Sequence, residues 1–159
     1  MKRKANVLVI YNNIMNPNAL PNNVLKNYIN ILESEVNRML GVSTNLKTRF
    51  YLDTTEGKKT SELVIEFKNK NSDEWHSISA SSGAEEMLLS LAIRVAMINV
   101  TTIHKSNLLV VDEGFGALDK DRLGELPNLL KTISKMFHAV IIISHLESMA
   151  SLPDKIIHV

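Results

Sequence analysis

Two apolar runs in the second half of the chain each end in residues that could do chemistry. Asp112 and Glu113 follow the run LLVV, and His145 follows the run AVIIIS. Ligands bind at the carboxyl ends of strands in open α/β sheets, and right-handed connections could place these three side chains on one rim. There, one carboxylate can hold hydrated Mg²⁺, a second can orient a water molecule, and a neutral histidine can hydrogen-bond a phosphate. The three residues therefore suit hydrolysis of a nucleotide phosphate.

A third candidate lies where a helical pattern begins. The segment SSGAE, residues 81–85, places Ser82 and Glu85 in the S-x-x-E spacing of a capping box. Amide groups in the first turn of a helix point outward at the positive end of the helix dipole, so they form a ready anion site. A phosphate would therefore fit at this turn.

Each of these motifs also has an ordinary structural alternative. The acidic pair could be a solvated turn, the histidine could be exposed or cap a helix, and S-x-x-E could be a plain helix cap. No partner pattern accompanies the other four histidines, which we expect to be structural: His76, His104, His138 and His158. The phosphate loop G-x-x-x-x-G-K-[ST] occurs nowhere in the chain. A faint echo at residues 54–60 lacks the upstream glycine, which favours a hairpin turn. The motifs thus predict half of a nucleotide site.

The periodicity of apolar residues predicts an α/β fold around these motifs. Residues 6–11 are a β-branched run that could be a strand. Residues 24–40 have one apolar stripe and should form a helix that stops at Gly41. The later segments are antiparallel strands at 46–52, 61–67 and 74–78, a buried helix of about twenty residues from residue 84, strands at 107–112 and 139–144 flanking a helix at 121–136, and a last strand at 155–159. Continuous apolar runs at 107–112 and 139–144 are typical of a parallel sheet covered on both faces.

Composition limits the other functional classes. The chain has 159 residues, 45% of them hydrophobic, which is enough for one domain with a real core. Its 18 basic and 17 acidic residues leave a net charge of +1, so no global basic field attracts nucleic acid. Cysteine is absent, which excludes disulfides and thiolate metal sites and favours an intracellular location. No apolar run approaches the roughly 18 residues of a membrane helix, so no membrane association is expected.

In their order and spacing, the motifs resemble the C-terminal lobe of ABC-type ATPase heads. The similarity is to heads of the structural-maintenance-of-chromosomes (SMC) and double-strand-break-repair type, including phage-type recombination ATPases. SSGAE is similar to the signature L-S-G-G-E, LLVVDE resembles the Walker B strand, GALD at residues 116–119 resembles the D-loop, and His145 looks like the switch histidine. Four motifs in the right order within about 65 residues are a specific signal.

The resemblance implies how the chain is organised. It would be a single C-terminal lobe of a P-loop ABC ATPase head, with a largely parallel sheet flanked by helices. Residues 1–45 would be a helical lead-in from a coiled coil, residues 46–78 an antiparallel layer, and residues 79–159 the region that carries the motifs. The lobe with the Walker A loop is absent from the sequence.

The resemblance also implies a mechanism, in which two heads sandwich ATP and Mg²⁺. Ser82, Gly83 and Glu85 would contact the nucleotide held by the partner head. Asp112 would organise Mg²⁺ and Glu113 would activate water. The γ phosphate would be sensed by His145, and Asp119 would signal across the dimer. Arg94 matches an arginine of the signature helix that relays nucleotide state, or is simply a charged side chain on a buried helix.

Partners follow from the same resemblance. They are a Walker A lobe on the same or a separate chain, a second head, a nuclease subunit, and DNA through the assembled complex, for DNA repair, recombination or chromosome organisation. The chain alone is expected to be inactive.

Ser81 and Ala84 replace the leucine and the second glycine of the signature, and the added methyl could alter the approach of a phosphate. A non-catalytic interaction module is the alternative, and a transporter fragment fits less well. Many asparagines and lysines suggest a viral or phage genome.

Overall fold

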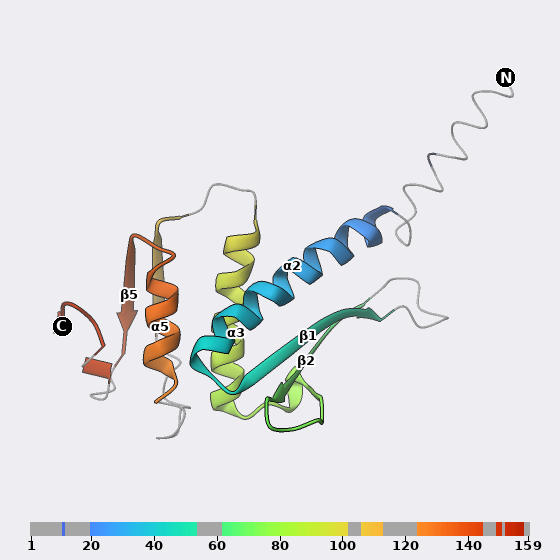
Figure 1. Ribbon diagram of the computed structural model, residues 1–159. Helices are drawn as coiled ribbons and strands as arrows, with labels where there is room; N and C mark the ends of the chain where they lie inside the picture. The colour runs from blue at the N-terminus through green and yellow to red at the C-terminus, as the bar shows by residue number, and fades with distance from the viewer. Residues whose placement is uncertain are drawn as a thin grey trace, which may run out of the picture.

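The computed structural model describes Tyr11 and residues 20–53, 62–101, 106–112, 124–144, 149–150 and 152–157. Helices lie between an antiparallel sheet and a parallel sheet (Figure 1), so the predicted α/β class is confirmed. The described elements are α2 (Leu20–Ser43), β1 (Leu46–Asp53), β2 (Glu62–Asn69), β3 (His76–Ser77), the 3-10 helix η1 (Ile78–Ala80), α3 (Gly83–Val100), β4 (Leu108–Asp112), α5 (Leu126–Ser134) and β5 (Ala139–Ile143). No helix within the described ranges is long and apolar enough to cross a membrane.

Helix α2 is buried along only part of its predicted apolar stripe. In its C-terminal half, Val36, Met39 and Leu40 are completely buried in the core. Nearer its start, Val24 and Tyr28 are each 46% exposed, and this part of the helix extends away from the body (Figure 1). The helix is therefore anchored at one end and carries uncovered apolar side chains at the other.

The prediction that α2 stops at Gly41 is wrong, because the helix continues to Ser43. Its last carbonyl groups find side-chain donors instead of requiring a glycine turn. The hydroxyl of Ser43 donates to the carbonyl of Met39 (3.0 Å), and that of Thr44 donates to the carbonyl of Leu40 (3.0 Å). Lys70 directly follows β2, and its ammonium donates to the carbonyls of Gly41 and Thr44.

Strands β1 and β2 pair antiparallel from Leu46 opposite Asn69 to Asp53 opposite Glu62, as the alternating pattern predicts. The hairpin connection between them, which includes the faint phosphate-loop echo, lies outside the described residues. The third predicted strand is shorter than expected: β3 covers two residues before the chain turns into η1. Alternate side chains of β1, including Leu46 and Phe50, face the core.

Helix α3 forms where the sequence predicts it, but it is not buried all round. Leu88, Ala92 and Val95 are completely buried, whereas Met97 is 57% exposed and Arg94 is exposed. The exposed side chains share one face because residues three and four apart are neighbours on a helix. The core therefore covers one side of α3 and leaves the other open.

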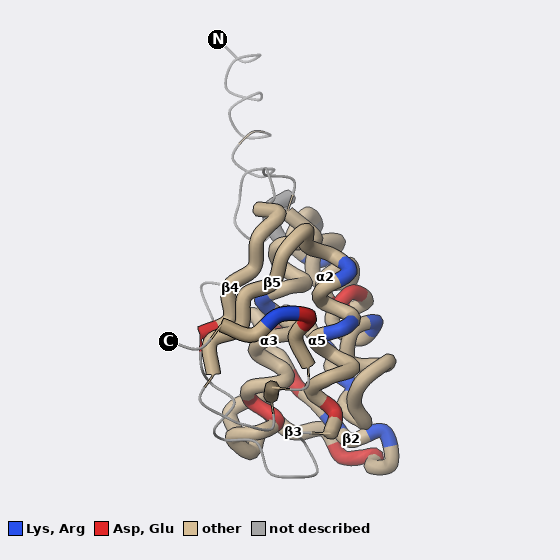
Figure 2. The backbone as a smooth tube through the Cα atoms, turned by 90° about the vertical axis from the view of Figure 1, so that its left-hand side faces the viewer, with Lys and Arg blue, Asp and Glu red and all other residues tan. Residues whose placement is uncertain are grey.

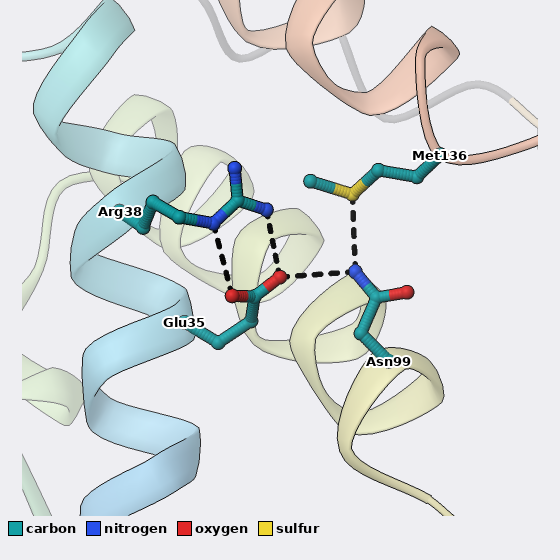
Figure 3. A network of polar contacts seen from close by, with 4 residues as sticks. All are labelled: Glu35, Arg38, Asn99 and Met136. Carbon is teal, nitrogen blue, oxygen red and sulfur yellow. Dashed lines mark hydrogen bonds and ion pairs between the residues drawn. The ribbon is translucent and has the colours of Figure 1, made fainter.

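A polar junction fixes the last turn of α3 against two other elements (Figure 3). The side-chain amide of Asn99 donates to Glu35 Oε1 on α2 (3.1 Å) and contacts Met136 Sδ just beyond α5 (3.1 Å). The same Glu35 carboxylate accepts two hydrogen bonds from Arg38, and this pairing raises the pKa of the Arg38 guanidinium. Three elements that are distant in sequence are thus joined at one point.

Three further segments differ from the predictions. Helix α5 begins at Leu126, after the expected start at residue 121, and Pro127 occupies its first turn, where the missing N–H costs nothing. Residues 155–157 are not a strand, contrary to the prediction for 155–159; a strand needs a neighbour to supply hydrogen-bond partners. Of the possible strand at 6–11, only Tyr11 is described, and it is helical.

Candidate nucleotide-binding site

The carboxyl ends of β4 and β5 meet at one edge of a parallel sheet. The register places Leu108 opposite Ala139 and Asp112 opposite Ile143. Asp112 is the last residue of β4 and is exposed to solvent. The predicted water-activating Glu113 follows it directly in sequence, and His145 follows Ile143 by two residues. Glu113, His145 and the predicted D-loop Asp119 lie outside the described residues, so their roles stay predictions.

Asp112, as the described carboxylate at this edge, fits a hydrated Mg²⁺ better than a fully protein-coordinated metal. Among the residues described, no group of three or more His, Cys, Asp and Glu side chains could hold a metal ion. Mg²⁺ usually keeps several waters and binds through one or two carboxylates together with substrate phosphates. The exposed oxygens of Asp112 are donors of the kind that Mg²⁺ prefers.

The capping box at the start of α3 is confirmed in full. The N–H of Glu85 donates to Ser82 Oγ (3.3 Å), and the N–H of Ser82 donates to Glu85 Oε2 (3.0 Å). The Ser82 hydroxyl also donates to Glu85 Oε2 (2.9 Å). Ser82 has extended φ and ψ angles of −65° and 157°, as an N-cap residue requires. The cap therefore fixes the position of the predicted phosphate-binding hydroxyl.

The two departures from the signature have simple structural explanations. Ala84 is only 5% exposed and belongs to the hydrophobic core, so its methyl group packs inward. The hydroxyl of Ser81 donates to the carbonyl of Ile78 (2.7 Å) and closes η1. Ser82 and Gly83 remain exposed. Neither departure covers the two residues predicted to meet a phosphate.

The structure does not join Ser82, at the start of α3, to Asp112, at the end of β4. The start of α3 and the carboxyl end of β5 lie toward the same end of the molecule (Figure 1). No hydrogen bond links Ser82 to Asp112 within the part of the chain that the structure describes. Ser82 and Asp112 are thus available to serve different nucleotides.

One feature of this region contradicts the sequence prediction. The pattern predicts parallel strands covered on both faces, but alternate residues of both strands face solvent. The exposed face carries four large apolar side chains that are 46–51% exposed: Leu108, Val110, Ile141 and Ile143. In Figure 2 both strands face the viewer, and no charged residue interrupts them before Asp112. The opposite face, with Leu109, Val111 and Ile142, packs against the core.

Continuous apolar strands in a sheet with one open face are unusual, because parallel sheets are normally buried on both sides. The apolar runs in the sequence indicate the strands correctly but do not show that one cover is missing. The lack of a phosphate loop in the sequence is the signal that could have indicated that the partner covering this face is missing. We name Leu108, Val110, Ile141 and Ile143 the open sheet face.

Comparisons with known proteins agree with this architecture. No protein-family model matches the chain. It is 33% identical to an uncharacterized protein of Acanthamoeba polyphaga mimivirus over 98% of its own length and 12% of the relative's. It is 29% identical to a component of the nuclease SbcCD from Rhodobacter capsulatus over 76% of its length and 9% of that protein. It is also 29% identical to the DNA double-strand break repair Rad50 ATPase of Archaeoglobus fulgidus over 67% of its length and 12% of that protein. The chain therefore spans only about a tenth of the length of these relatives.

Solved structures with a similar fold include SMC heads. One, from work on ATP-driven dimerization and DNA-stimulated activation of SMC ATPases, matches with a TM-score of 0.69 at 23% identity, over 86% of this chain and 81% of the other. A second is the Smc head domain with an extended coiled coil from Pyrococcus furiosus, bound to the C-terminal domain of ScpA. It matches with a TM-score of 0.68 at 21% identity, over 96% of this chain and 37% of the other.

Proposed function

We propose that this chain, which has the fold of the C-terminal lobe of an SMC-type ATPase head, is one half of an ATP-hydrolysing head of the DNA-repair type. The open sheet face supports this proposal most strongly. Leu108, Val110, Ile141 and Ile143 form the kind of apolar surface that a second lobe normally covers, and it ends at the predicted catalytic residues. The lobe with the Walker A loop is the partner that the motifs require.

In the assembled head, each residue has a distinct task. Asp112 would hold Mg²⁺, which would supply positive charge to offset that of the phosphates. Glu113 orients the attacking water, and His145 hydrogen-bonds the γ phosphate. Asp119 contacts the partner head. A chain without the phosphate loop cannot hold ATP firmly, so it is inactive alone.

The start of α3 serves the other nucleotide of the head dimer. The Ser82 hydroxyl and the Gly83 amide bind the γ phosphate held by the partner head, at the positive end of the α3 dipole. Support comes from the exposure of both residues and from the absence of a hydrogen bond between Ser82 and Asp112 in the described part of the chain. Glu85 is part of the same predicted nucleotide site.

The exposed stripe of α2 supports a coiled-coil continuation. Val24, Tyr28 and Ile31 are spaced by four and three residues and are about half exposed. This spacing suits a seam with a second helix. The named relatives suggest further partners: one is part of the nuclease SbcCD, and a solved Smc head is bound to ScpA. We propose a nuclease subunit as the partner and DNA as the substrate of the assembled complex, within an intracellular, virus- or phage-related setting.

The test joins this chain to a lobe that carries G-x-x-x-x-G-K-[ST] and measures Mg²⁺-dependent ATP hydrolysis. We expect activity in the assembled head and a loss of about 100-fold or more with Glu113→Gln, because one group that acts in the transition state is removed. Glu125→Gln is the matched control, since Glu125 precedes α5 and has no predicted catalytic role. An active complex that Glu113→Gln leaves unchanged would refute the catalytic assignment. ATP-dependent assembly without any turnover would favour the non-catalytic interaction module.

A further inference from the structure

The outward face of the hairpin formed by β1 and β2 carries one sign of charge at each end. In the register of the two strands, Lys47 lies opposite Lys68 at one end, and Asp53 lies opposite Glu62 at the other. These side chains alternate along the strands with those that face the core. Like charges directly opposite each other on a sheet repel, so the arrangement within each pair does not stabilise the hairpin.

Between its charged ends, this face has a centre that is neutral and partly aromatic. Arg49 lies opposite Glu66 and forms an ion pair with it, and Tyr51 lies opposite Val64. Tyr51 is 41% exposed, and the Cζ atom of Arg49 lies 5.7 Å from the centroid of its ring. Trp75 packs on the same guanidinium, with 4.4 Å between Cζ and the ring centroid. We name this surface the outer hairpin face, which consists of Lys47, Arg49, Tyr51, Asp53, Glu62, Val64, Glu66 and Lys68.

The positive end of the outer hairpin face is weakly neutralised by the chain itself. Lys47 is exposed, and it forms no ion pair within the part of the chain that the structure describes. Lys68 lies over the Trp75 ring, and its Nζ is 3.7 Å from the carboxylate of the exposed Asp73. An ion pair of this kind at the surface contributes little. The positive charge at this end is therefore available to a partner.

The order of charges along the outer hairpin face is complementary to itself. A second copy, turned by 180° about an axis that crosses the strands, can lie face to face with the first while its strands run in the opposite direction. Lys47 of each copy then faces Asp53 of the other, and the basic pair at one end meets the acidic pair of the other copy. In the centre, Arg49 of each copy faces Tyr51 of the other, and a guanidinium over an aromatic ring is favourable.

We propose that the outer hairpin face is a contact surface for a second copy of this chain. It lies on the side of the antiparallel sheet that faces away from the helices and from the parallel sheet (Figure 1). The contact therefore uses neither the start of α3 nor the end of β4, and it is independent of the proposed function. A nucleic acid fits this face less well, because Asp53 and Glu62 would repel its phosphates.

The size of the face sets the strength of the contact. Eight residues at about 3.3 Å each and two strands about 4.8 Å apart give a surface about 26 Å long and about 10 Å wide. This is much smaller than the roughly 800 Å² that each partner buries in a stable complex. We therefore expect a reversible association with a Kd of about 0.1–1 mM that weakens as salt screens the charges.

The experiment measures the oligomeric state of the purified chain by sedimentation at increasing protein concentration. Every variant also carries Ile141→Asp, so that the open sheet face does not contribute an apolar contact. Lys47→Glu and Asp53→Lys should each weaken self-association by about tenfold or more, because like charges then face each other at both ends of the symmetric contact. An equimolar mixture of the two variants should associate as the parent does, since the opposite charges meet again. The variant with both substitutions should also recover.

Lys26→Glu is the matched control, because it reverses the same charge at an exposed position on α2. It should change self-association by less than about twofold. A parent chain that stays monomeric at about 1 mM would overturn the proposal. An equal effect of Lys26→Glu and Lys47→Glu, or a mixture that does not recover, would also overturn it. Binding of a short single-stranded DNA that Lys47→Glu abolishes, with self-association unchanged, would assign the face to nucleic acid instead.

Discussion

The side-chain amide of Asn37 binds both backbone groups of Thr48. Its Oδ1 accepts from the Thr48 N–H (2.8 Å), and its Nδ2 donates to the Thr48 carbonyl (2.8 Å). One turn earlier on α2, a Glu33 carboxylate oxygen accepts from the N–H of Phe50 (2.8 Å). Side chains of α2 thus complete the hydrogen bonds of β1 along the edge that no neighbouring strand covers in the described part of the chain. The edge of the antiparallel sheet is closed without another strand.

We expect Asn37→Ala to lower the free energy of unfolding by about 2 kcal/mol, because both backbone groups of the buried Thr48 lose their partner. Chemical unfolding of the purified chain measures this change. Asn30→Ala is the control, since Asn30 is exposed on the same helix and should change stability by less than about 0.5 kcal/mol. Equal effects of the two substitutions would mean that Asn37 does not support β1.

The junction at Asn99 predicts that even a nearly isosteric substitution lowers the free energy of unfolding. Asn99→Asp replaces the donor to Glu35 with a second carboxylate at hydrogen-bond distance. We expect a loss of about 1–3 kcal/mol of unfolding free energy at neutral pH, from repulsion between like charges at a partly buried position. Asn71→Asp, at an exposed turn position, should cost little. A stability equal to that of the parent chain would show that Glu35 does not depend on Asn99.

Two substitutions of Ser82, the N-cap residue of α3, should distinguish its role in folding from its role in function. Ser82→Ala should lower the unfolding free energy by about 1 kcal/mol, because the N–H of Glu85 loses its acceptor. Ser82→Asn should restore most of this stability but not the ATP-dependent association of the assembled heads. Recovery of both properties with asparagine would show that the hydroxyl itself is not needed.

The ammonium of Lys70 should contribute to the free energy of unfolding by an amount that depends on the salt concentration. Lys70→Met removes donors to the carbonyls of Gly41 and Thr44 at the negative end of α2. We expect a cost of about 0.3–1 kcal/mol at low salt that diminishes at about 1 M salt, where exposed charges are screened. Lys47→Met, on the exposed side of β1, is the control. A cost that does not change with salt would show that Lys70 acts through packing.

The open sheet face should be needed for assembly rather than for folding of this lobe. Ile141→Asp should weaken association with a Walker A lobe by about tenfold or more, because an unpaired charge would be buried in the interface. The unfolding free energy of the chain alone should change by less than about 1 kcal/mol, since Ile141 is half exposed. Val42→Asp introduces the same charge at a side chain that is exposed near the end of α2. Similar losses of association from both substitutions would place the interface elsewhere.

Local patterns predicted most of the fold because they report on contacts within the chain. The alternation in β2 predicted the strand correctly but not a clean wet face, because Leu63 on the predicted core side is 43% exposed. The S-x-x-E spacing at Ser82 and Glu85 predicted a capping box that the structure contains. The sequence could not indicate where α2 ends, because the donors that extend it past Gly41 include Lys70, which is 29 residues away. The local pattern of the strand also could not reveal that Ile141 is exposed, because an apolar strand has the same pattern whether its cover is present or absent; only the missing phosphate loop elsewhere in the sequence points to the absent cover. The roles of Glu113, Asp119 and His145 remain predictions.

Because α2 is buried only in its C-terminal half, a rotation at that end produces a larger displacement at its start. Its C-terminal half is fixed by Val36, Met39 and the hydrogen bonds from Asn37, while its first turns project beyond the core. Leu20 lies about 25 Å from Asn37 along the axis, at about 1.5 Å per residue. A rotation of about 10° at the fixed end would therefore move the start of the helix by about 4 Å. A small rotation within the lobe therefore becomes a displacement of several ångströms at the start of α2.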